Sequence, residues 1–430
     1  MLVVCAVAML AVANLQYAWT LFTTPLTDHL GTSLAKVQWA FTFFVLSQAL
    51  LMPLNTLLVD RFGVRIVVMI GGLFVGVGWM GAGLARSLTE LYFAYGLGGV
   101  GVGAVYGACI GLAMKWFYNR RGLCVGVVAG SYGFGTALTA IPISHMIKIS
   151  GYQSTFIMWG AIQGLIVLIA AQFLITPPAG WLPPSRTGGE IKKPSRLKQS
   201  KRDYEPREML KSLPFYVLYL MMILVTFSGL MVTAQLQPIG VKYSFDKYVL
   251  LGSLTVLNIA IPLNSVLNGS ARPFFGFLAD RVGRYETMAM VFCLEAVALT
   301  TLTFVVSRPI WFIIVSGVIL FAWGDVYSSF PSAIADIFGA KHATTNYGIQ
   351  YTAKGIGGIF AGPCAAWLME RAGGSWIPVF WSGVACNVLA ALLAIFWLKP
   401  MVTRLLGESK TAEVTSETVP VEVRQAASGD

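Results

Sequence analysis

Apolar runs long enough to span a bilayer recur along most of the chain. The first six lie near residues 1–24, 37–58, 66–85, 91–114, 122–146 and 154–176. Six more lie near residues 213–236, 248–278, 286–306, 309–337, 347–369 and 377–398. A transmembrane helix needs about 20 mainly apolar residues. The pattern therefore predicts an all-α polytopic membrane protein with 12 transmembrane helices.

Polar segments divide the predicted helices into two bundles of six. Residues 1–176 form the N-terminal bundle, and residues 213–398 form the C-terminal bundle. Between them, residues 177–212 contain several prolines and nine Lys and Arg residues, which predicts a basic cytoplasmic linker. The last segment, 399–430, is polar and carries several glutamates, so we expect a disordered cytoplasmic tail.

The composition excludes a soluble globular protein. Hydrophobic residues make up 56% of the chain and charged residues only 11%, whereas soluble domains have about a quarter charged residues. The net charge of +11 resides mainly in the loops: 21 Lys and Arg residues fall on one side of the predicted membrane and 7 on the other. Because cytoplasmic loops carry such an excess, both termini are predicted to be cytoplasmic. The basic residues thus indicate orientation in a lipid bilayer and not nucleic-acid binding.

Residues that build metal, redox or hydrolytic sites are dispersed along the chain. The six cysteines lie singly inside apolar runs, and His29, His145 and His342 are far apart. No spacing among them is typical of metal ligands, and no Ser/His/Asp arrangement appears. We therefore predict no metal, no cofactor and no enzymatic activity.

A glycine pattern at residues 96–101 fits G-x-G-x-x-G, a signature of dinucleotide binding when it follows a strand. Here it lies inside a predicted transmembrane helix. Glycines recur every four residues along that helix, at Gly99, Gly103, Gly107 and Gly111. This spacing predicts a face of small residues for close helix packing.

A charged turn occurs twice, with its aspartates 220 residues apart. The first copy contains Asp60, Arg61 and Gly63, and the second contains Asp280, Arg281, Gly283 and Arg284. The separation matches an offset of six helices, and two duplicated six-helix halves are one design of secondary transporters. The turns resemble the loop motif of the major facilitator superfamily. The resemblance implies two pseudo-symmetric six-helix bundles and a gating role for these residues on the cytoplasmic face.

Two cations, Arg272 and Lys354, lie inside predicted transmembrane helices. A charge at the bilayer centre costs about 2.5–3.5 kcal/mol on insertion scales, and such residues usually mark substrate pathways. Each is roughly 10–12 Å from the cytoplasmic end of its helix, at about 1.5 Å per residue. We expect them to face one cavity and to bind an anionic substrate.

Internal ion pairing is the alternative interpretation of these cations. The candidate acids within or near the ends of helices are Glu295, Asp325 and Asp336. Asp325 points away from the helix face that carries Trp323 and Tyr327, because it is about 200° from Trp323 around a helix. We therefore favour substrate binding.

Polar and aromatic residues occur at a depth similar to that of the two cations. They are Gln16, Tyr17, Gln48, Tyr106, Tyr132, Trp323, Tyr327 and Tyr351. Amides and hydroxyls donate hydrogen bonds to carboxylate oxygens, while rings enclose a small flat anion. We expect this set to line a binding site for a small carboxylate.

Several segments resemble the oxalate/formate antiporter family of bacteria, and the similarity covers essentially every helix. They are residues 15–21, 268–274, 323–332 and 346–354. The resemblance implies that Arg272 and Lys354 bind the two carboxylates of oxalate and that the polar and aromatic set lines the pocket. It also implies oxalate:formate antiport by a monomer in the bacterial inner membrane.

Other functions remain possible from the sequence. A proton-coupled symporter of monocarboxylates such as pyruvate or lactate is the main alternative. Related monocarboxylate porters carry an acid one turn before the arginine, whereas this chain has Asn268, so only Asp325 keeps that alternative open. A non-transporting membrane sensor would need an output domain, for which the linker is too short.

Overall fold

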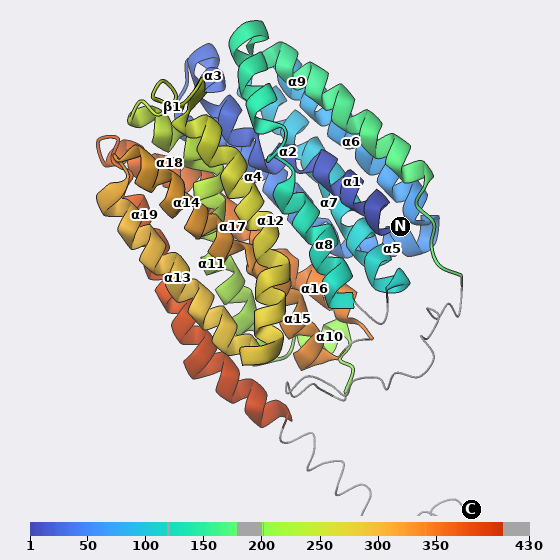
Figure 1. Cartoon of the computed structure of the whole chain (residues 1–430). Helices are drawn as coiled ribbons and strands as arrows, with labels where there is room; N and C mark the ends of the chain where they lie inside the picture. The colour runs from blue at the N-terminus through green and yellow to red at the C-terminus, as the bar shows by residue number, and fades with distance from the viewer. Residues whose placement is uncertain (118–120, 179–199, 201, 340, 407–430) are drawn as a thin grey trace, which may run out of the picture.

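The protein is almost entirely helical (Figure 1). The computed structural model describes residues 1–117, 121–178, 200, 202–339 and 341–406. The elements before the linker are α1 (Leu2–Val12), α2 (Asn14–Tyr17), α3 (Trp19–Leu30), α4 (Leu34–Leu50), α5 (Met52–Phe62), α6 (Val64–Leu84), α7 (Leu88–Trp116), α8 (Arg121–Phe134) and α9 (Ala140–Gln172).

The elements after the linker include two short π-helical segments and one small hairpin. They are α10 (Pro206–Met209), α11 (Leu213–Lys242), β1 (Val249–Leu251), β2 (Leu254–Thr255), α12 (Val256–Val282), α13 (Arg284–Val305), α14 (Pro309–Gly324), α15 (Val326–Phe338), α16 (Ala343–Tyr351), α17 (Ala353–Ile359), η2 (Phe360–Cys364), α18 (Ala365–Arg371), α19 (Ile377–Leu392) and η3 (Leu393–Leu398). In Figure 1 the blue-to-teal helices lie mainly to the right of the yellow-to-red ones.

Eight helices in the described part of the chain are long and apolar enough to cross a membrane. The bent pair α4 and α5 makes a ninth if it is counted as one span. Of the other predicted runs, 122–146 contains the short α8, 248–278 contains the charged α12, and 347–369 contains the interrupted α16 to α18. The structure thus shows an all-helical multi-pass protein with eight or nine candidate spans, where the apolar pattern predicted 12.

Two predicted boundaries differ from the structure. The run 248–278 begins with an antiparallel hairpin, because Gly252 turns the chain with a φ of 57° and α12 begins only at Val256. The predicted break between the runs 122–146 and 154–176 is not a separate loop. Two helical segments meet directly at Gly151, whose φ of 76° and ψ of 164° interrupt α9.

The ends of the two predicted bundles also differ. The last helix continues through Leu406, past the expected end at 398, because Val402 continues the apolar face and is buried. Part of the predicted linker is ordered: the Tyr204 backbone N–H donates to the Phe338 carbonyl at 2.8 Å, and the Asp203 carboxylate accepts from the Lys341 N–H at 3.0 Å. Residues 179–199, 201 and 407–430 of the linker and tail lie outside the described residues.

The glycine face of α7 packs closely against α4, as predicted. A Cβ at Gly99 would lie 2.3 Å from the Phe44 carbonyl oxygen, and one at Gly103 would lie 2.8 Å from that of Gln48. Gly107 contacts Met52, whereas Gly111 has open space around it and lines a cavity. The G-x-G-x-x-G sequence therefore allows helices to approach, as small residues do in membranes.

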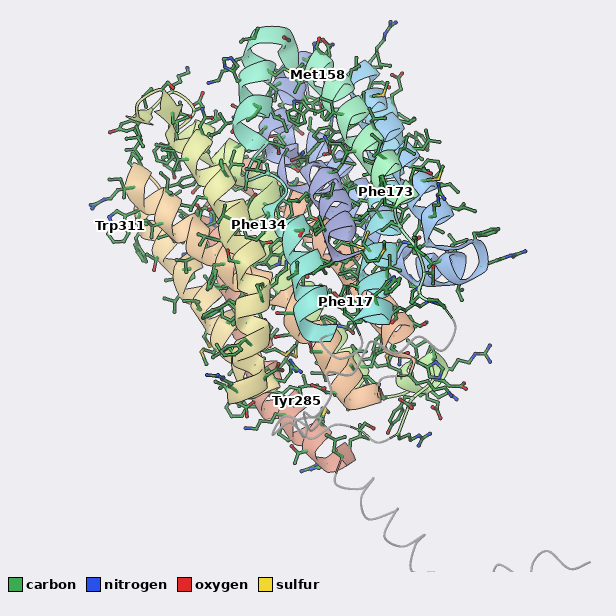
Figure 2. All side chains as sticks on the ribbon, turned by 45° about the vertical axis from the view of Figure 1, so that its right-hand side comes forward. Phe117, Phe134, Met158, Phe173, Tyr285 and Trp311 are labelled. Atoms are coloured by element: carbon green, nitrogen blue, oxygen red, sulfur yellow. The ribbon has the colours of Figure 1, made fainter. Side chains whose placement is uncertain are left out.

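The outside of the helical assembly carries large apolar side chains. Met158, Phe173 and Trp311 are exposed and lie at the periphery (Figure 2). Soluble monomers rarely expose continuous apolar surface on this scale, whereas lipid tails accept it. The surface is thus consistent with several spans in a bilayer.

Candidate functional site

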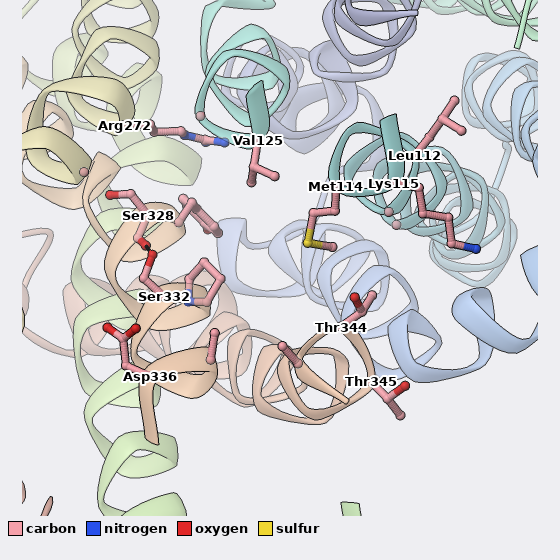
Figure 3. A pocket seen from close by; sticks show the side chains of 18 of the residues that line it. Leu112, Met114, Lys115, Val125, Arg272, Ser328, Ser332, Asp336, Thr344 and Thr345 are labelled. Carbon is pink, nitrogen blue, oxygen red and sulfur yellow. Dashed lines mark hydrogen bonds between the residues drawn. The ribbon is translucent and has the colours of Figure 1, made fainter. Parts of the chain in front are cut away.

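A cavity of about 950 Å³ lies between the helices before the linker and those after it. Its lining comes from α7 and α8 on one side and from α12, α15 and α16 on the other (Figure 3). It extends from Arg272, which is buried, to Asp280, whose side chain is 60% exposed. The cavity therefore opens at the end where α7, α12 and α15 terminate, on the predicted cytoplasmic side.

Arg272 lies at the inner end of this cavity, on α12. One terminal nitrogen donates to the Ala129 carbonyl of α8. The other lies 3.2 Å from both the Tyr17 hydroxyl and the Asn268 side-chain oxygen. Tyr17 in turn donates to Asn268 at 3.0 Å, so the guanidinium joins α12 to α2 and α8.

Lys354 lies in α17 and is fully buried. Its ammonium donates to the side-chain oxygens of Gln16 and Gln48, each at 2.7 Å, and to the Tyr351 hydroxyl at 3.1 Å. The Tyr132 hydroxyl connects the two amides, since it accepts from Gln48 at 3.2 Å and donates to Gln16 at 3.1 Å.

Aromatic rings connect the surroundings of the two cations. The Tyr327 ring centre lies 4.5 Å from the Arg272 guanidinium carbon and 5.6 Å from the Lys354 ammonium. Trp323 packs edge-on against Tyr327 at 5.3 Å between ring centres. The structure thus brings both cations against one ring.

The remaining predicted residues belong to the same cluster. Tyr106 packs against Tyr132 at 5.4 Å and against Tyr351 at 5.7 Å between ring centres. Tyr17 packs against Tyr132 at 5.6 Å. All ten predicted substrate-binding residues are therefore buried in one connected cluster contributed by elements from both sides of the linker.

Three interrupted helices supply most of this cluster. Gln16 and Tyr17 form part of the four-residue α2, between breaks at Ala13 and Ala18. Trp323 and Tyr327 lie on either side of the break at Asp325, and Tyr351 and Lys354 on either side of Thr352. At these breaks the backbone N–H bonds to the carbonyl three residues earlier, as from Asp325 to Ala322 at 3.1 Å. Such tight helical turns often mark functional hinges, and discontinuous helices line transporter sites.

No carboxylate pairs with either cation among the residues that the structure describes. The Asp325 carboxylate accepts instead from Ser329 at 2.6 Å and Ser328 at 3.1 Å. Glu295 accepts from Ser228 at 2.6 Å, and Asp336 pairs with Arg284 at 2.9 Å. The alternative of internal ion pairing therefore lacks its partner in this conformation.

Several buried donors of the cluster have no acceptor within the described part of the chain. They are the Gln16 amide nitrogen, the Arg272 Nε, the Trp323 indole nitrogen and the Tyr327 hydroxyl. A buried donor without a partner costs about 1–3 kcal/mol. Two cations, one of which carries an unmatched donor, and three further unmatched donors form a site that an acceptor-rich anion would satisfy.

Sequence reasoning did not identify two groups that position Arg272. The Ala129 carbonyl carries no side-chain signal. From the sequence, Asn268 is the residue that replaces an acid of related porters, and no contact with Arg272 is predicted. In the structure its side-chain oxygen accepts from Tyr17 and Arg272, and its amide nitrogen donates to the Leu320 carbonyl at 3.0 Å. Its position one helical turn before Arg272 could have indicated this contact.

The two charged turns have related backbone geometry. Gly63 and Gly283 both have positive φ, 83° and 127°, with ψ near 150°. Arg284 pairs with Asp280 at 3.4 Å as well as with Asp336, so the second turn connects α12, α13 and α15.

The other arginine of each turn lies near an aromatic ring. Arg281 lies over the Phe277 ring at 4.1 Å, and Arg61 lies 5.3 Å from the Phe62 ring centre. The side chain of Asp60 lies outside the described residues.

Comparison with known proteins gives the family. The family model for the Major Facilitator Superfamily matches residues 4–263 and 243–427. The chain is 34% identical to an oxalate:formate antiporter of Oxalobacter formigenes over 93% of its length and 91% of that protein. An uncharacterised MFS-type transporter of Escherichia coli is 27% identical over 80% of this chain and 81% of that protein. Monocarboxylate transporter 12-B of Danio rerio is 22% identical over 85% of this chain and 80% of that protein.

These matches confirm the resemblance to the oxalate/formate antiporter family and imply the major facilitator fold. They also exclude an enzyme, because the family consists of transporters. The chain belongs to the Major Facilitator Superfamily and is a multi-pass membrane transporter of that family.

Proposed function

We propose that this protein exchanges small carboxylates across the membrane by alternating access, with oxalate and formate as its substrates. The observation that carries the proposal is the pair of buried cations without a carboxylate partner, together with four unmatched donors, one on Arg272 itself and three on Gln16, Trp323 and Tyr327. The similarity to an oxalate:formate antiporter over nearly the whole chain supports the same substrates.

Each residue of the cluster has a role in this proposal. Arg272 and Lys354 bind the two carboxylates of oxalate. Trp323 and Tyr327 donate to carboxylate oxygens, and the other tyrosines and amides position the cations and enclose the anion. The charged turns at Asp60 and Asp280 take part in gating the cytoplasmic face.

The surrounding architecture follows from the apolar pattern and the family. We propose 12 spans in two bundles of six, with residues 213–398 repeating the plan of residues 1–176. The excess of Lys and Arg on one side of the predicted membrane supports cytoplasmic termini and a cytoplasmic linker. We further propose that the protein acts as a monomer in a bacterial inner membrane.

Exchange, as opposed to net uptake, follows from the charges of the site. Oxalate neutralises both cations as the cavity closes, whereas an empty site keeps two buried charges at a cost of several kcal/mol per ion. Reorientation without substrate should therefore be slow. Exchange of a dianion for a monoanion also moves net charge across the membrane.

Uptake of labelled oxalate into proteoliposomes tests this function. The vesicles are loaded with oxalate, formate, pyruvate or nothing, with and without a pH gradient. We expect uptake only into vesicles loaded with oxalate or formate, independent of the pH gradient. Uptake into empty vesicles that requires an inward proton gradient would contradict antiport.

Proton-coupled monocarboxylate uptake is the second candidate, since monocarboxylate transporters are among the similar proteins. Labelled pyruvate in the same vesicles distinguishes it. The acid available for coupling, Asp325, contacts Ser328 and Ser329 and does not reach either cation. The geometry favours exchange.

A further inference from the structure

The two cations of the site differ in how many of their donors are already used. An ammonium has three N–H groups, and Lys354 directs one to Gln16, one to Gln48 and one to Tyr351. Both amide oxygens lie 2.7 Å from the Lys354 nitrogen. Lys354 is thus fully matched without any anion.

Arg272 is matched only in part. Its terminal nitrogens reach Ala129, Tyr17 and Asn268, but its Nε has no acceptor among the described residues. The nearby Tyr327 hydroxyl has none either. Two of the four unmatched donors, the Arg272 Nε and the Tyr327 hydroxyl, are therefore on the arginine side of the cluster, whereas the ammonium of Lys354 has no unmatched donor.

The cavity reaches the two cations unequally. Arg272 and Tyr327 are among the residues that line it, whereas Lys354, Gln16 and Gln48 lie deeper, outside its lining (Figure 3 shows Arg272 at the inner end). An anion that enters from the open side thus meets Arg272 first.

We propose that the site consists of two unequal subsites, and that Gln16 and Gln48 determine the choice between one and two carboxylates. The first carboxylate binds at Arg272 and uses its open donors. The second reaches Lys354 only by displacing the oxygens of Gln16 and Gln48, which take the place of a carboxylate when none is bound. This inference rests on the proposed function and deepens it.

A monoanion and a dianion therefore make different demands on the site. Formate is satisfied at Arg272 and leaves Lys354 with its amide partners. Oxalate must exchange neutral amide oxygens for its second carboxylate, and it gains an ion pair in return. A fixed carboxylate beside Lys354 would occupy the second subsite permanently and convert the carrier to monoanions.

Gln16→Glu makes this change with little disturbance. The oxygen of Gln16 accepts from Lys354 and Tyr132, and a glutamate oxygen can keep both bonds. The substitution replaces an amide nitrogen that has no acceptor with a second carboxylate oxygen, and it adds one negative charge beside Lys354. Gln48→Glu places the carboxylate at the second oxygen and serves as an independent variant if the first does not fold.

The experiment measures oxalate self-exchange and formate self-exchange in proteoliposomes for the wild type and each variant. Monodisperse elution and thermal unfolding of the purified proteins establish folding. We expect the ratio of oxalate exchange to formate exchange to fall by at least about tenfold in each variant, since specificity is a difference between two affinities. Oxalate should also stabilise the purified variant against heat less than it stabilises the wild type. The corresponding decrease with formate should be smaller.

Gln163→Glu is the matched control, because Gln163 is a buried amide of α9 outside the cavity. Its ratio of oxalate to formate exchange should equal that of the wild type. Selective loss of oxalate in either folded site variant supports the inference. Unchanged oxalate exchange, or equal loss of both anions in both folded variants, overturns it, whereas a wild type inactive with both anions overturns the proposed function as well.

Discussion

Arg272 and Lys354 are each held in place by residues from the opposite side of the linker. Tyr17 and Ala129 contact Arg272, and Gln16 and Gln48 contact Lys354. Each cation therefore connects the helices that must move relative to one another in alternating access. In the proposed function, substrate binding and closure of the cavity therefore act on the same side chains.

Tyr17→Phe tests whether the position of Arg272 matters for binding. The variant loses the hydroxyl that accepts from Arg272 and donates to Asn268. A hydrogen bond contributes about 0.5–1.5 kcal/mol, so the oxalate concentration for half-maximal exchange should rise roughly two- to tenfold.

Tyr95→Phe is the control for that substitution. Its buried hydroxyl donates to the Leu15 carbonyl and contacts neither cation. It should lower the melting temperature slightly and leave the half-maximal concentration unchanged. An unchanged value in Tyr17→Phe, or an equal increase in both variants, would refute the role of Tyr17.

At the scale of residues, the sequence indicates the cations but not their partners. Charged residues inside apolar runs are conspicuous, so Arg272 and Lys354 could be identified directly. The contact of Lys354 with Gln16 spans 338 positions and depends on how the helices pack. The Ala129 carbonyl has no sequence signal at all.

Among the helices, α4 is connected to α11 by a buried polar contact on the side away from the cavity mouth. The Gln38 amide nitrogen donates to the Gln235 side-chain oxygen at 2.9 Å and to the Ala234 carbonyl at 3.1 Å. The Gln38 oxygen accepts from Trp19 at 2.9 Å. The Gln235 amide nitrogen donates to the Gly362 carbonyl of η2 at 3.0 Å. The bond between Gln38 and Gln235 thus joins a helix before the linker to elements after it.

Gln38→Leu should weaken this closed side. The substitution leaves the Trp19 indole nitrogen and the Gln235 side-chain oxygen without their partner, at about 1–3 kcal/mol for each buried group. Spin labels at Thr32 and Gly373, in the turns before α4 and after α18, would report the change as a population at longer distances. Electron paramagnetic resonance measures that distribution.

Gln163→Leu is the matched control, because neither amide atom of Gln163 has a partner among the described residues. Its distance distribution should match the wild type. If Gln38→Leu also matches, then Gln38 does not hold this side closed.

At the scale of elements, the apolar pattern located the helices but not their interruptions. The breaks at Ala18, Asp325 and Thr352 fall within continuous apolar runs without a proline at the break. They arise where polar side chains from several helices meet, a tertiary condition that periodicity does not contain. The hairpin before α12 was missed because its residues are as apolar as a span.

For the whole molecule, the cavity is open on one side and closed on the other. It reaches the exposed Asp280 at its mouth, while Gln38, Gln235 and the Tyr17–Asn268 contact close the opposite side. In the predicted orientation, this is an inward-facing arrangement. The charge distribution could predict orientation, whereas the sequence contains no signal for which face is open.

The repeat of the charged turn is the sequence feature that best anticipates the overall plan. Gly63 follows α5 and Gly283 follows α12, 220 residues later, and both have positive φ with ψ near 150°. Their glycines are needed because positive φ is unfavourable for other residues. Hydropathy does not identify α12 as a span, because this helix carries Arg272 and several other charged and polar residues.

The most direct test of the central claim is counterflow of labelled oxalate by wild type, Arg272→Gln and Lys354→Gln in oxalate-loaded proteoliposomes. If the two cations bind the substrate, the wild type accumulates label and each folded variant loses at least about 90% of the initial rate, since removing one partner of a buried charge pair costs roughly 3–5 kcal/mol. Oxalate counterflow at the wild-type rate in either variant would contradict the account.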